Sequence, residues 1–398
     1  MHFLFIVDDY LPYSIKVAAL MMHELALEFK KNGHSVTVLT PRPNQENSIV
    51  IQKLDEIEII YFKSGKIKNT GKIRRAINES LLPFIPLKVC KNFFENKRYD
   101  GIVYYSPSIF WGYLVQKLKK RWNCPSYLIL RDIFPQWTVD NGLMNAKSPI
   151  YWYFKFWEYI SYKNADRIGV MSPSNLMYFQ KRFRDISKYE VLYNWSQISN
   201  VPIFKRKYRK ELNLKGKIVL FYGGNIGHAQ QMMNLVNLAK QFKTNEKVHF
   251  LFVGKGDQVE LILREKEDNC LSNITYLPSV SQEDYFIMLN EFDIGLFSLH
   301  PDHKTHNFPG KLLGYMNYSK PILGCVNKGN DLMQIINHSK AGIVVESGDN
   351  EMFYRAALQL IESEEYREFM GKNGRELLET QFSIKKAYNK IYFALSGN

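Results

Sequence analysis

The strongest candidate for chemistry is a lysine, Lys311, in a stretch rich in glycine and aromatic residues. The stretch reads Lys304-Thr-His306-Asn307-Phe308-Pro309-Gly310-Lys311-Leu312-Leu313-Gly314-Tyr315-Met316. Asn307 could cap a helix with Pro309 in its first turn, which would carry Lys311. A lysine there can neutralise the charge of a departing diphosphate. The alternative is an ordinary exposed helix lysine, and the surrounding motif favours the functional interpretation.

A glycine-rich turn is the second candidate. It follows the apolar run Ile218–Tyr222 and reads Gly223-Gly224-Asn225-Ile226-Gly227. Glycines let a ligand approach the backbone closely, and a helix beginning near His228 would offer free N–H groups to a phosphate. Gly254 belongs to a second joint of this kind. At both joints a plain strand-to-helix turn is the alternative.

Two further candidates lie in the first half of the chain. Arg131 and Asp132 follow an apolar run, so the pair would stand at the carboxyl end of a strand. In doubly wound sheets ligands bind beyond these strand ends. Ser14 and Lys16 lie in the first strand-to-helix loop. The alternatives are a structural salt bridge for the pair and an ordinary loop for Ser14 and Lys16.

The segment Lys63–Arg98 combines positive charge with an apolar stripe. It holds ten basic and two acidic residues. The stripe has helical spacing and consists of Ile73, Ile77, Leu81 and Phe84. Such a segment suits attachment to anionic lipid, with each cation adding about 1 kcal/mol. Alternatively the stripe faces the core. Nucleic-acid binding is not favoured, because no recognised module or set of interleaved stacking aromatics accompanies the charge.

Alternating strand and helix patterns must position these residues. The run Phe3–Val7, a helical pattern through Phe29 and the run Ser35–Thr40 form a βαβ unit. The alternation continues to a basic connection near 196–210 and then restarts. We therefore predict two Rossmann-like, doubly wound α/β domains facing a central cleft. The first covers 1–198, the second covers 199–381, and a last helix, about 382–398, packs back on the first.

Composition limits the class of protein. The chain has 398 residues and a formal net charge of +14, which suggests an anionic partner. Its 4 cysteines are scattered, so reduced thiols are expected. The aromatic run Tyr151–Ile160 is interrupted by charges and predicts a packed helix. We expect neither a signal peptide nor a membrane span.

Taken together, four motifs resemble a known family. They are Gly33–Thr40 (GHSVTVLT), Arg131–Pro135 (RDIFP), Gly224–Gly227 (GNIG) and Phe308–Tyr315 (FPGKLLGY). The chain resembles the family-4 retaining glycosyltransferases, which have the GT-B fold. In particular it resembles the N-acetyl-L-fucosaminyl transferases of bacterial O-antigen and capsule clusters.

The resemblance implies roles for individual residues. Gly224–Gly227 and Lys311 would hold the diphosphate, and the loop Leu277–Val280 would contact the base. Arg131 or Asp132 would lie near the anomeric carbon, so the implied catalytic residues are Arg131, Asp132 and Lys311. Ser14 and Lys16 would meet the acceptor or the donor phosphates. The full donor-binding set is Gly223, Gly224, Asn225, Ile226, Gly227, Gly254, Val280, His306, Asn307, Phe308, Pro309, Gly310, Lys311 and Leu312.

The sequence departs from the family in two places. Many relatives carry two glutamates where His306 and Gly314 stand here, so the usual ribose-binding carboxylate is absent. Gln230 and Gln231 stand where a basic residue usually follows the GNIG turn.

The expected function is retaining transfer from a UDP-sugar to a polyprenyl-diphosphate-linked saccharide. No cofactor or essential metal is predicted, because no paired-carboxylate motif is seen. The expected location is the cytoplasmic side of a bacterial plasma membrane, with anionic inner-leaflet lipid bound through Lys63–Arg98. Two alternatives remain: a nucleotide-sugar epimerase of GT-B fold, or an inactive binding subunit.

Overall fold

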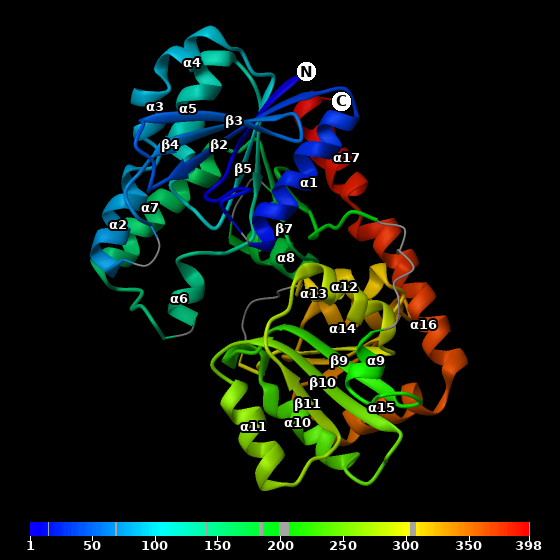
Figure 1. The fold of residues 1–398 in the computed structure, drawn as a ribbon. Helices are drawn as coiled ribbons and strands as arrows, with labels where there is room; N and C mark the ends of the chain where they lie inside the picture. The colour runs from blue at the N-terminus through cyan, green and yellow to red at the C-terminus, as the bar shows by residue number, and fades with distance from the viewer. Residues whose placement is uncertain are drawn as a thin grey trace. The chain divides into compact units, whose positions relative to one another are not determined.

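The computed structural model describes residues 1–14, 16–67, 70–140, 142–182, 186–198, 207–302 and 308–397. It divides the chain into two compact units (Figure 1). Unit 1 comprises Met1–Trp195 with Ile384–Asn398, and unit 2 comprises Ser196–Ser383. The chain therefore leaves unit 1, builds unit 2 and returns.

Unit 1 is built on an eight-stranded sheet in the order β3-β4-β2-β1-β5-β6-β7-β8. All neighbouring strands run parallel except the pair β3 and β4. The strands are β1 His2–Ile6, β2 Ser35–Arg42, β3 Ile49–Leu54, β4 Ile57–Lys63, β5 Gly101–Tyr105, β6 Ser126–Ile129, β7 Arg167–Val170 and β8 Tyr189–Val191.

Helices cover both faces of this sheet, as the buried runs of its central strands require. They are α1 Val17–Lys31, α2 Lys72–Leu81, α3 Ile85–Val89, α4 Lys91–Asn96, α5 Trp111–Trp122, α6 Gln136–Asp140, α7 Pro149–Asn164, α8 Pro173–Arg182 and α17 Ile384–Ser396. Helix α1 ends before Gly33, whose φ of 81° suits the left-handed turn that follows a helix.

Strand β3 was not expected from the sequence. It pairs antiparallel with β4 through a tight turn at Asp55 and Glu56, which both have positive φ. Its residues are mostly half-buried or exposed. An edge strand that buries little carries a weak hydrophobic signal, which explains why the sequence pattern did not indicate a strand there.

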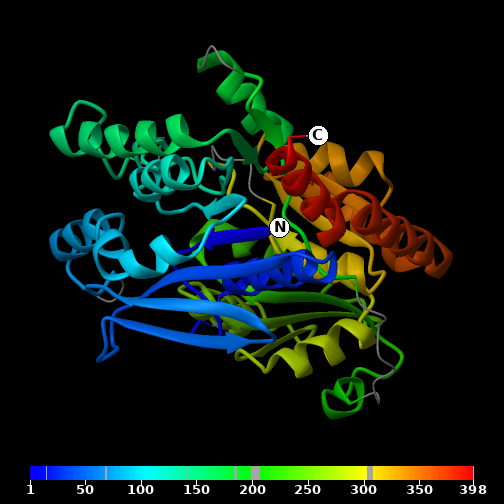
Figure 2. The same cartoon turned by 90° about the horizontal axis from the view of Figure 1, so that it is seen from above.

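Helix α17 completes the core of unit 1. Its Ile391 is fully buried, and the Tyr388 ring lies 4.8 Å from the Phe29 ring of α1. The Tyr388 hydroxyl is also 3.0 Å from Nε2 of His34. Figures 1 and 2 show the red α17 beside the blue α1.

Unit 2 has a six-stranded, fully parallel sheet in the order β11-β10-β9-β12-β13-β14. This is the doubly wound order, with the topological switch point between β9 and β12. The strands are β9 Ile218–Asn225, β10 Val248–Lys255, β11 Ile274–Leu277, β12 Ile294–Ser298, β13 Ile322–Val326 and β14 Gly342–Glu346. The helices are α9 Tyr208–Glu211, α10 Met232–Gln241, α11 Val259–Asp268, α12 Gln282–Glu291, α13 Lys311–Asn317, α14 Asp331–His338, α15 Asn350–Glu362 and α16 Glu364–Leu377, with the short turns η1 His228–Gln230 and η2 Leu378–Phe382.

Candidate functional site

Lys311 is the first residue of α13, and its ammonium group is in an unusual environment. Its Nζ lies 3.4 Å from the centroid of the Tyr222 ring. The Nζ atom is buried, and no described residue accepts a hydrogen bond from it. Burial lowers the pKa of Lys311 well below its usual value. A buried cation that lacks an acceptor is unfavourable until an anion arrives.

The glycine-rich turn lies directly beside this lysine. Gly224 has a φ of 125°, and a Cβ placed on it would be 3.7 Å from Nζ of Lys311. The residue is exposed, so its backbone is open to a ligand. The structure therefore brings together the two strongest candidates of the sequence, which are almost ninety residues apart.

The backbone after Gly224 differs from the expected helix start. Residues 228–230 form only a 3₁₀ turn, and α10 begins at Met232. The N–H groups of Gly227 and His228 donate to Oε1 of Gln230 at 3.2 Å and Oδ1 of Asp257 at 3.0 Å. The prediction of free N–H groups at a helix beginning near His228 is therefore wrong. Lys311 remains as the source of positive charge.

Gln230 closes the turn. Its Oε1 also accepts a hydrogen bond from Nδ2 of Asn225 at 2.8 Å. On the other side, Ile226 is fully buried and its N–H donates to the Lys255 carbonyl at 2.9 Å. Gly254 is the register partner of Gly224 in the β9–β10 pair. Side-chain and strand hydrogen bonds thus hold the turn in one shape.

The remaining donor candidates lie on either side of α13 or in other loops. Gly310 caps α13, so Pro309 precedes the helix instead of lying in its first turn. Phe308 is buried, and its ring centroid is 4.4 Å from that of Phe382. Leu312 is fully buried. Val280 is half-buried and precedes α12. His306 and Asn307, including the predicted Asn307 cap, lie outside the described residues.

The position of the missing glutamate, Gly314, has a neighbour that sequence reasoning did not identify. A Cβ on Gly314 would lie 3.9 Å from the Tyr285 hydroxyl. A Cβ on Gly223 would lie 2.4 Å from the same tyrosine ring. Gly223 thus makes room for this ring, whereas the tighter neighbour of a Cβ at Gly314 is Cδ1 of Leu289 at 3.3 Å. Spacing along the sequence does not reveal these contacts, because the residues belong to separate elements.

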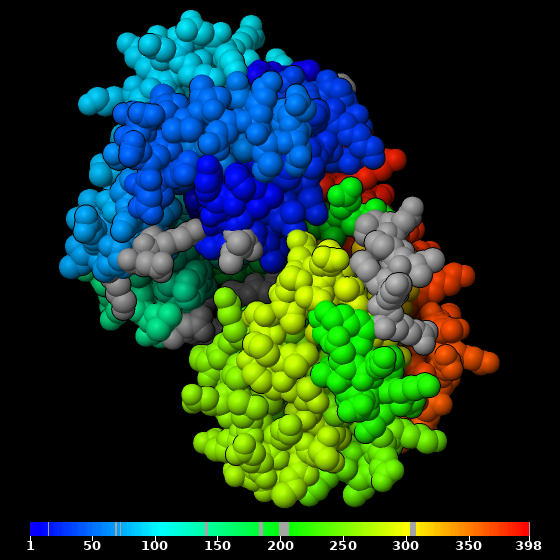
Figure 3. All heavy atoms as spheres, viewed as in Figure 1, coloured from blue at the N-terminus to red at the C-terminus, as the bar shows by residue number. Residues whose placement is uncertain are grey.

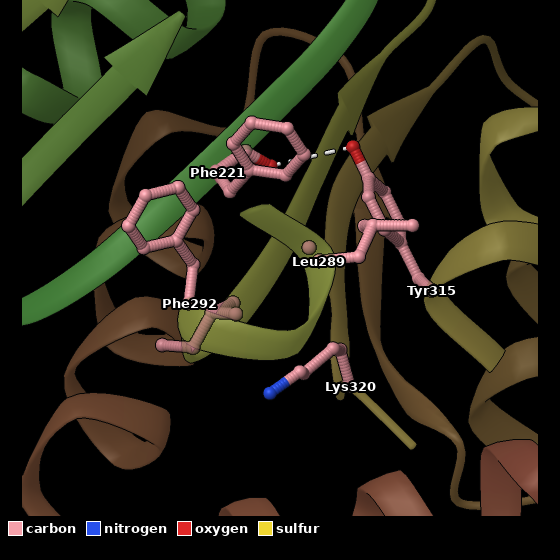
Figure 4. A pocket seen from close by; sticks show the side chains of 7 residues that line it. Phe221, Leu289, Phe292, Tyr315 and Lys320 are labelled. Carbon is pink, nitrogen blue, oxygen red and sulfur yellow. Dashed lines mark hydrogen bonds between the residues drawn. The ribbon is translucent and has the colours of Figure 1, made fainter. Parts of the chain in front are cut away.

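Tyr315 is a second residue that sequence reasoning missed. Its hydroxyl donates to the Leu296 carbonyl at 2.9 Å and accepts from the Gly223 N–H at 3.4 Å. It also lies 3.3 Å from the Phe221 carbonyl oxygen. A dashed line in Figure 4 marks this contact. One phenol thus joins β9, β12 and α13 behind the glycine turn.

Replacing this phenol tests its role. We expect Tyr315→Phe to lower the free energy of unfolding by about 1–3 kcal/mol, because buried backbone groups lose a partner. The measurement is urea denaturation. Tyr354→Phe is a matched control, because the Tyr354 hydroxyl makes no hydrogen bond to the residues that the structure describes, and it should change stability by less than about 0.5 kcal/mol. Equal stability of the two variants would contradict the assignment.

A narrow apolar hollow lies next to Tyr315 in unit 2 (Figure 4). Its empty volume is about 150 Å³, and its lining includes Phe221, Leu289 and Phe292. Pockets for drug-sized ligands measure about 300–1,000 Å³. The hollow is therefore too small for a nucleotide sugar.

Arg131 in unit 1 is buried, and its guanidinium forms hydrogen bonds with backbone carbonyls. Its guanidinium donates to the carbonyls of Leu192 at 2.9 Å and Tyr193 at 3.2 Å. Its Cζ lies 5.3 Å from the centroid of the Trp195 ring. Burial lowers the pKa of Arg131 to about 10, so it stays protonated at neutral pH. This arrangement gives Arg131 a structural task that the sequence did not indicate.

We therefore expect Arg131→Met to act first on stability. The variant keeps the stem but leaves two carbonyls without a donor, which should destabilise unit 1 by about 2–4 kcal/mol. The measurement is the thermal unfolding transition, with UDP affinity as the companion value. An unchanged transition together with lost activity would instead indicate direct contact with substrate.

The other candidates of unit 1 differ in their exposure to solvent. The Asp132 side chain is exposed to solvent. Partial desolvation nevertheless raises the pKa of its carboxyl, although the positive charge of Arg131 acts to lower that pKa. Lys16 is exposed, caps α1, and its Nζ is 3.5 Å from Oδ2 of Asp9. Ser14 is buried, and its Oγ accepts from the Lys16 N–H at 3.2 Å.

Most of the apolar stripe of the basic segment does not face the core. Ile73, Ile77 and Leu81 on α2 are exposed. Phe84 is partly exposed, but its ring centroid lies 5.0 Å from that of Tyr113 and 6.1 Å from that of the buried Trp157. The interpretation of this stripe as core-facing is therefore wrong for the three residues on α2. The aromatic helix α7 is also packed on one side only, because several of its rings are exposed.

Among the described residues, no helix is both long and apolar enough to cross a membrane. The same residues contain no group of three or more His, Cys, Asp or Glu side chains placed to hold a metal ion.

Comparison with known proteins gives family matches for both units. Residues 18–196 match the model described as Glycosyltransferase Family 4, and residues 204–377 match that of Glycosyl transferases group 1. The "Probable glycosyltransferase WbjE" of Pseudomonas aeruginosa is 26% identical over 54% of this chain and 54% of its own. "O-antigen chain mannosyltransferase C" of Escherichia coli is 26% identical over 36% of this chain and 39% of its own. The alignments thus span about half or less of these relatives.

The solved structures agree on the fold. Anabaena HepE in complex with UDP and glucose superimposes with a TM-score of 0.72 at 15% identity, covering 100% of both chains. The predicted fold, two Rossmann-like domains of the GT-B type, is confirmed. The two family matches also confirm a glycosyltransferase-type enzyme at the level of its domains.

Proposed function

We propose that this chain, with its two glycosyltransferase domains, transfers a sugar from a UDP-sugar to a lipid-diphosphate-linked saccharide in O-antigen or capsule synthesis. The observation that carries the proposal is the ammonium of Lys311, buried beside the open backbone of Gly224 and lacking an acceptor among the described residues. A diphosphate would supply the missing negative charge. The UDP bound to HepE and the O-antigen name of one relative support the substrate class.

The chemistry proposed for unit 2 is stabilisation of the leaving group. As the bond between sugar and phosphate breaks, negative charge grows on the phosphate oxygens. Protonated Lys311 would offset that charge, and the Tyr222 ring under Nζ favours the cationic form. In retaining transfer the leaving phosphate can itself accept the proton of the acceptor hydroxyl, so no separate base is required.

Two finer parts of the proposal rest on the sequence resemblance: retention of configuration, and N-acetyl-L-fucosamine or a related 6-deoxy-N-acetylhexosamine as donor sugar. Independence of a divalent metal rests on the lack of a paired-carboxylate motif in the sequence. The location at the inner face of a bacterial plasma membrane, with anionic lipid as a partner, is supported by the basic, amphipathic segment Lys63–Arg98. Asp132 is kept as the candidate catalytic carboxylate, and Arg131 as a residue that positions the segment around it.

The test is nucleotide release. Purified protein is incubated with a panel of UDP- and GDP-sugars, with and without a synthetic lipid-diphosphate GlcNAc acceptor and with and without EDTA. We expect acceptor-dependent UDP release that resists EDTA. Donor conversion without acceptor would indicate an epimerase, and no turnover with any donor would indicate a binding subunit.

A further inference from the structure

Helix α7 carries aromatic side chains on two sides but is covered on only one. Phe154 and Trp157 face the interior and are each 8% exposed. Trp152, Phe156 and Tyr159 recur at spacings of four and three, and are 63%, 57% and 56% exposed. A helix that is apolar all round normally lies inside a protein or a membrane. The outer side of α7 therefore lacks a cover within the described part of unit 1.

Helix α2 continues this uncovered surface. Its Ile73, Ile77 and Leu81 are 80%, 56% and 47% exposed. The hydroxyls of Ser80 and Tyr153 lie 2.5 Å apart and join α2 to α7. Figure 1 shows both helices at the same edge of unit 1, and in Figure 3 their blue and blue-green atoms lie at that margin. We define the α2–α7 face as Ile73, Ile77, Leu81, Trp152, Phe156 and Tyr159.

Basic side chains accompany the α2–α7 face. Helix α2 contributes the exposed Arg74, together with Arg75, which is paired with Glu79 at 2.8 Å. On α7, exposed Lys163 follows Tyr159 by one turn, and its Nζ lies 5.6 Å from the centroid of the Tyr159 ring. The acidic residue of α7, Glu158, is buried and paired with Lys155. The charges at the uncovered face are therefore mainly positive.

We propose that the α2–α7 face docks onto the surface of an anionic lipid bilayer. Rings with a polar tip, such as Trp152 and Tyr159, favour the headgroup level, aliphatic side chains favour the acyl boundary, and Arg and Lys pair with lipid phosphates. The inference rests on the membrane partner of the proposed function but not on its donor chemistry. It assigns the contact to α2 and α7 instead of the whole segment Lys63–Arg98.

The first test is co-sedimentation with vesicles of phosphatidylcholine, with and without phosphatidylglycerol. We expect binding to the anionic vesicles that weakens at high salt. Combining Trp152→Ser, Phe156→Ser and Tyr159→Ser should reduce the partition coefficient by about tenfold or more. The matched control combines Met352→Ser, Phe369→Ser and Phe393→Ser, which are similarly exposed on other helices, and should bind as the unaltered protein does.

A second measurement does not depend on the folding of the triple variant. Brominated lipid should quench the fluorescence of the unaltered protein, and Trp152→Phe should remove most of that quenching. Equal vesicle binding by the triple variant and its control would overturn the proposal. Lipid-independent dimers that dissociate only in the triple variant would also overturn it, in favour of a second copy of this chain. The proposed sugar transfer is tested separately, with a water-soluble acceptor. If no nucleotide is released with that acceptor, the proposed function fails independently of lipid binding.

Discussion

Lys311→Met should lower kcat for sugar transfer by about 100- to 1,000-fold, the usual effect of removing one group that stabilises developing charge. Methionine keeps the length and packing of the stem while removing the ammonium. The protein should fold as before, and relief of the buried charge should leave its stability equal or higher. The measurement is UDP release at saturating donor. The matched control is Lys372→Met, an exposed lysine on α16 of the same unit.

The lowered pKa of Lys311 gives the same residue a thermodynamic signature. A bound diphosphate favours the charged lysine and raises its pKa, so UDP binding should take up protons where the free lysine is partly neutral. UDP affinity should therefore fall as pH rises through the lowered pKa of the free protein. Calorimetry in buffers of different ionisation enthalpy measures the uptake. Equal uptake by Lys311→Met would assign it to another group.

The second large effect is expected at Gly254. Its φ is 152°, and a Cβ would lie 1.8 Å from the carbonyl oxygen of Gly224. Gly254→Ala must therefore move the glycine turn itself. We expect a loss of roughly 2–6 kcal/mol in unfolding free energy, as backbone strain and overpacking each contribute about 1–3 kcal/mol. UDP binding should become undetectable by calorimetry.

A substitution at a second glycine, Gly348, distinguishes the effect of backbone strain from the effect of a steric clash. Gly348 has a φ of 102°, but its Cβ would meet no atom within 4 Å. Gly348→Ala should lose only about 1–2 kcal/mol, the effect of the positive φ alone, and should bind UDP normally. If both variants lost the same unfolding free energy and still bound UDP, the close approach of β9 and β10 would not be required for UDP binding.

Much of the fold could be predicted because buried parallel strands have a strong sequence signal. The runs Ile218–Tyr222 and Val248–Val253 are apolar except for His249, each is followed by glycine, and the structure has β9 and β10 there. Strand β3 was not predicted, because its residues form a half-exposed sheet edge and therefore lack a continuous apolar run. The start of α10 was misplaced because the hydrogen bonds of Gln230 and Asp257 to the turn depend on tertiary position.

The motifs in the sequence identified which residues form the candidate site, but they did not indicate which side chains surround those residues. The motif singles out Lys311, but only the fold shows that Tyr222 lies under its Nζ. The sequence likewise marks Arg131, whereas its hydrogen bonds to residues 192 and 193 require the β6–β8 region to be assembled. Periodicity found the apolar stripe of α2, yet amphipathic spacing alone does not say whether a stripe faces a core or an outside partner.

The return of the chain to unit 1 has a consequence for synthesis on the ribosome. Chains emerge amino terminus first, and domains generally fold as they emerge. Here Ile391 and Leu395 of α17 belong to the core of unit 1, so that core stays open until the residues of α17 have left the exit tunnel. Unit 2, begun later, has all of its residues by Ser383. The unit that is translated first is therefore the one completed last, and it must keep its apolar surface from aggregating throughout that delay.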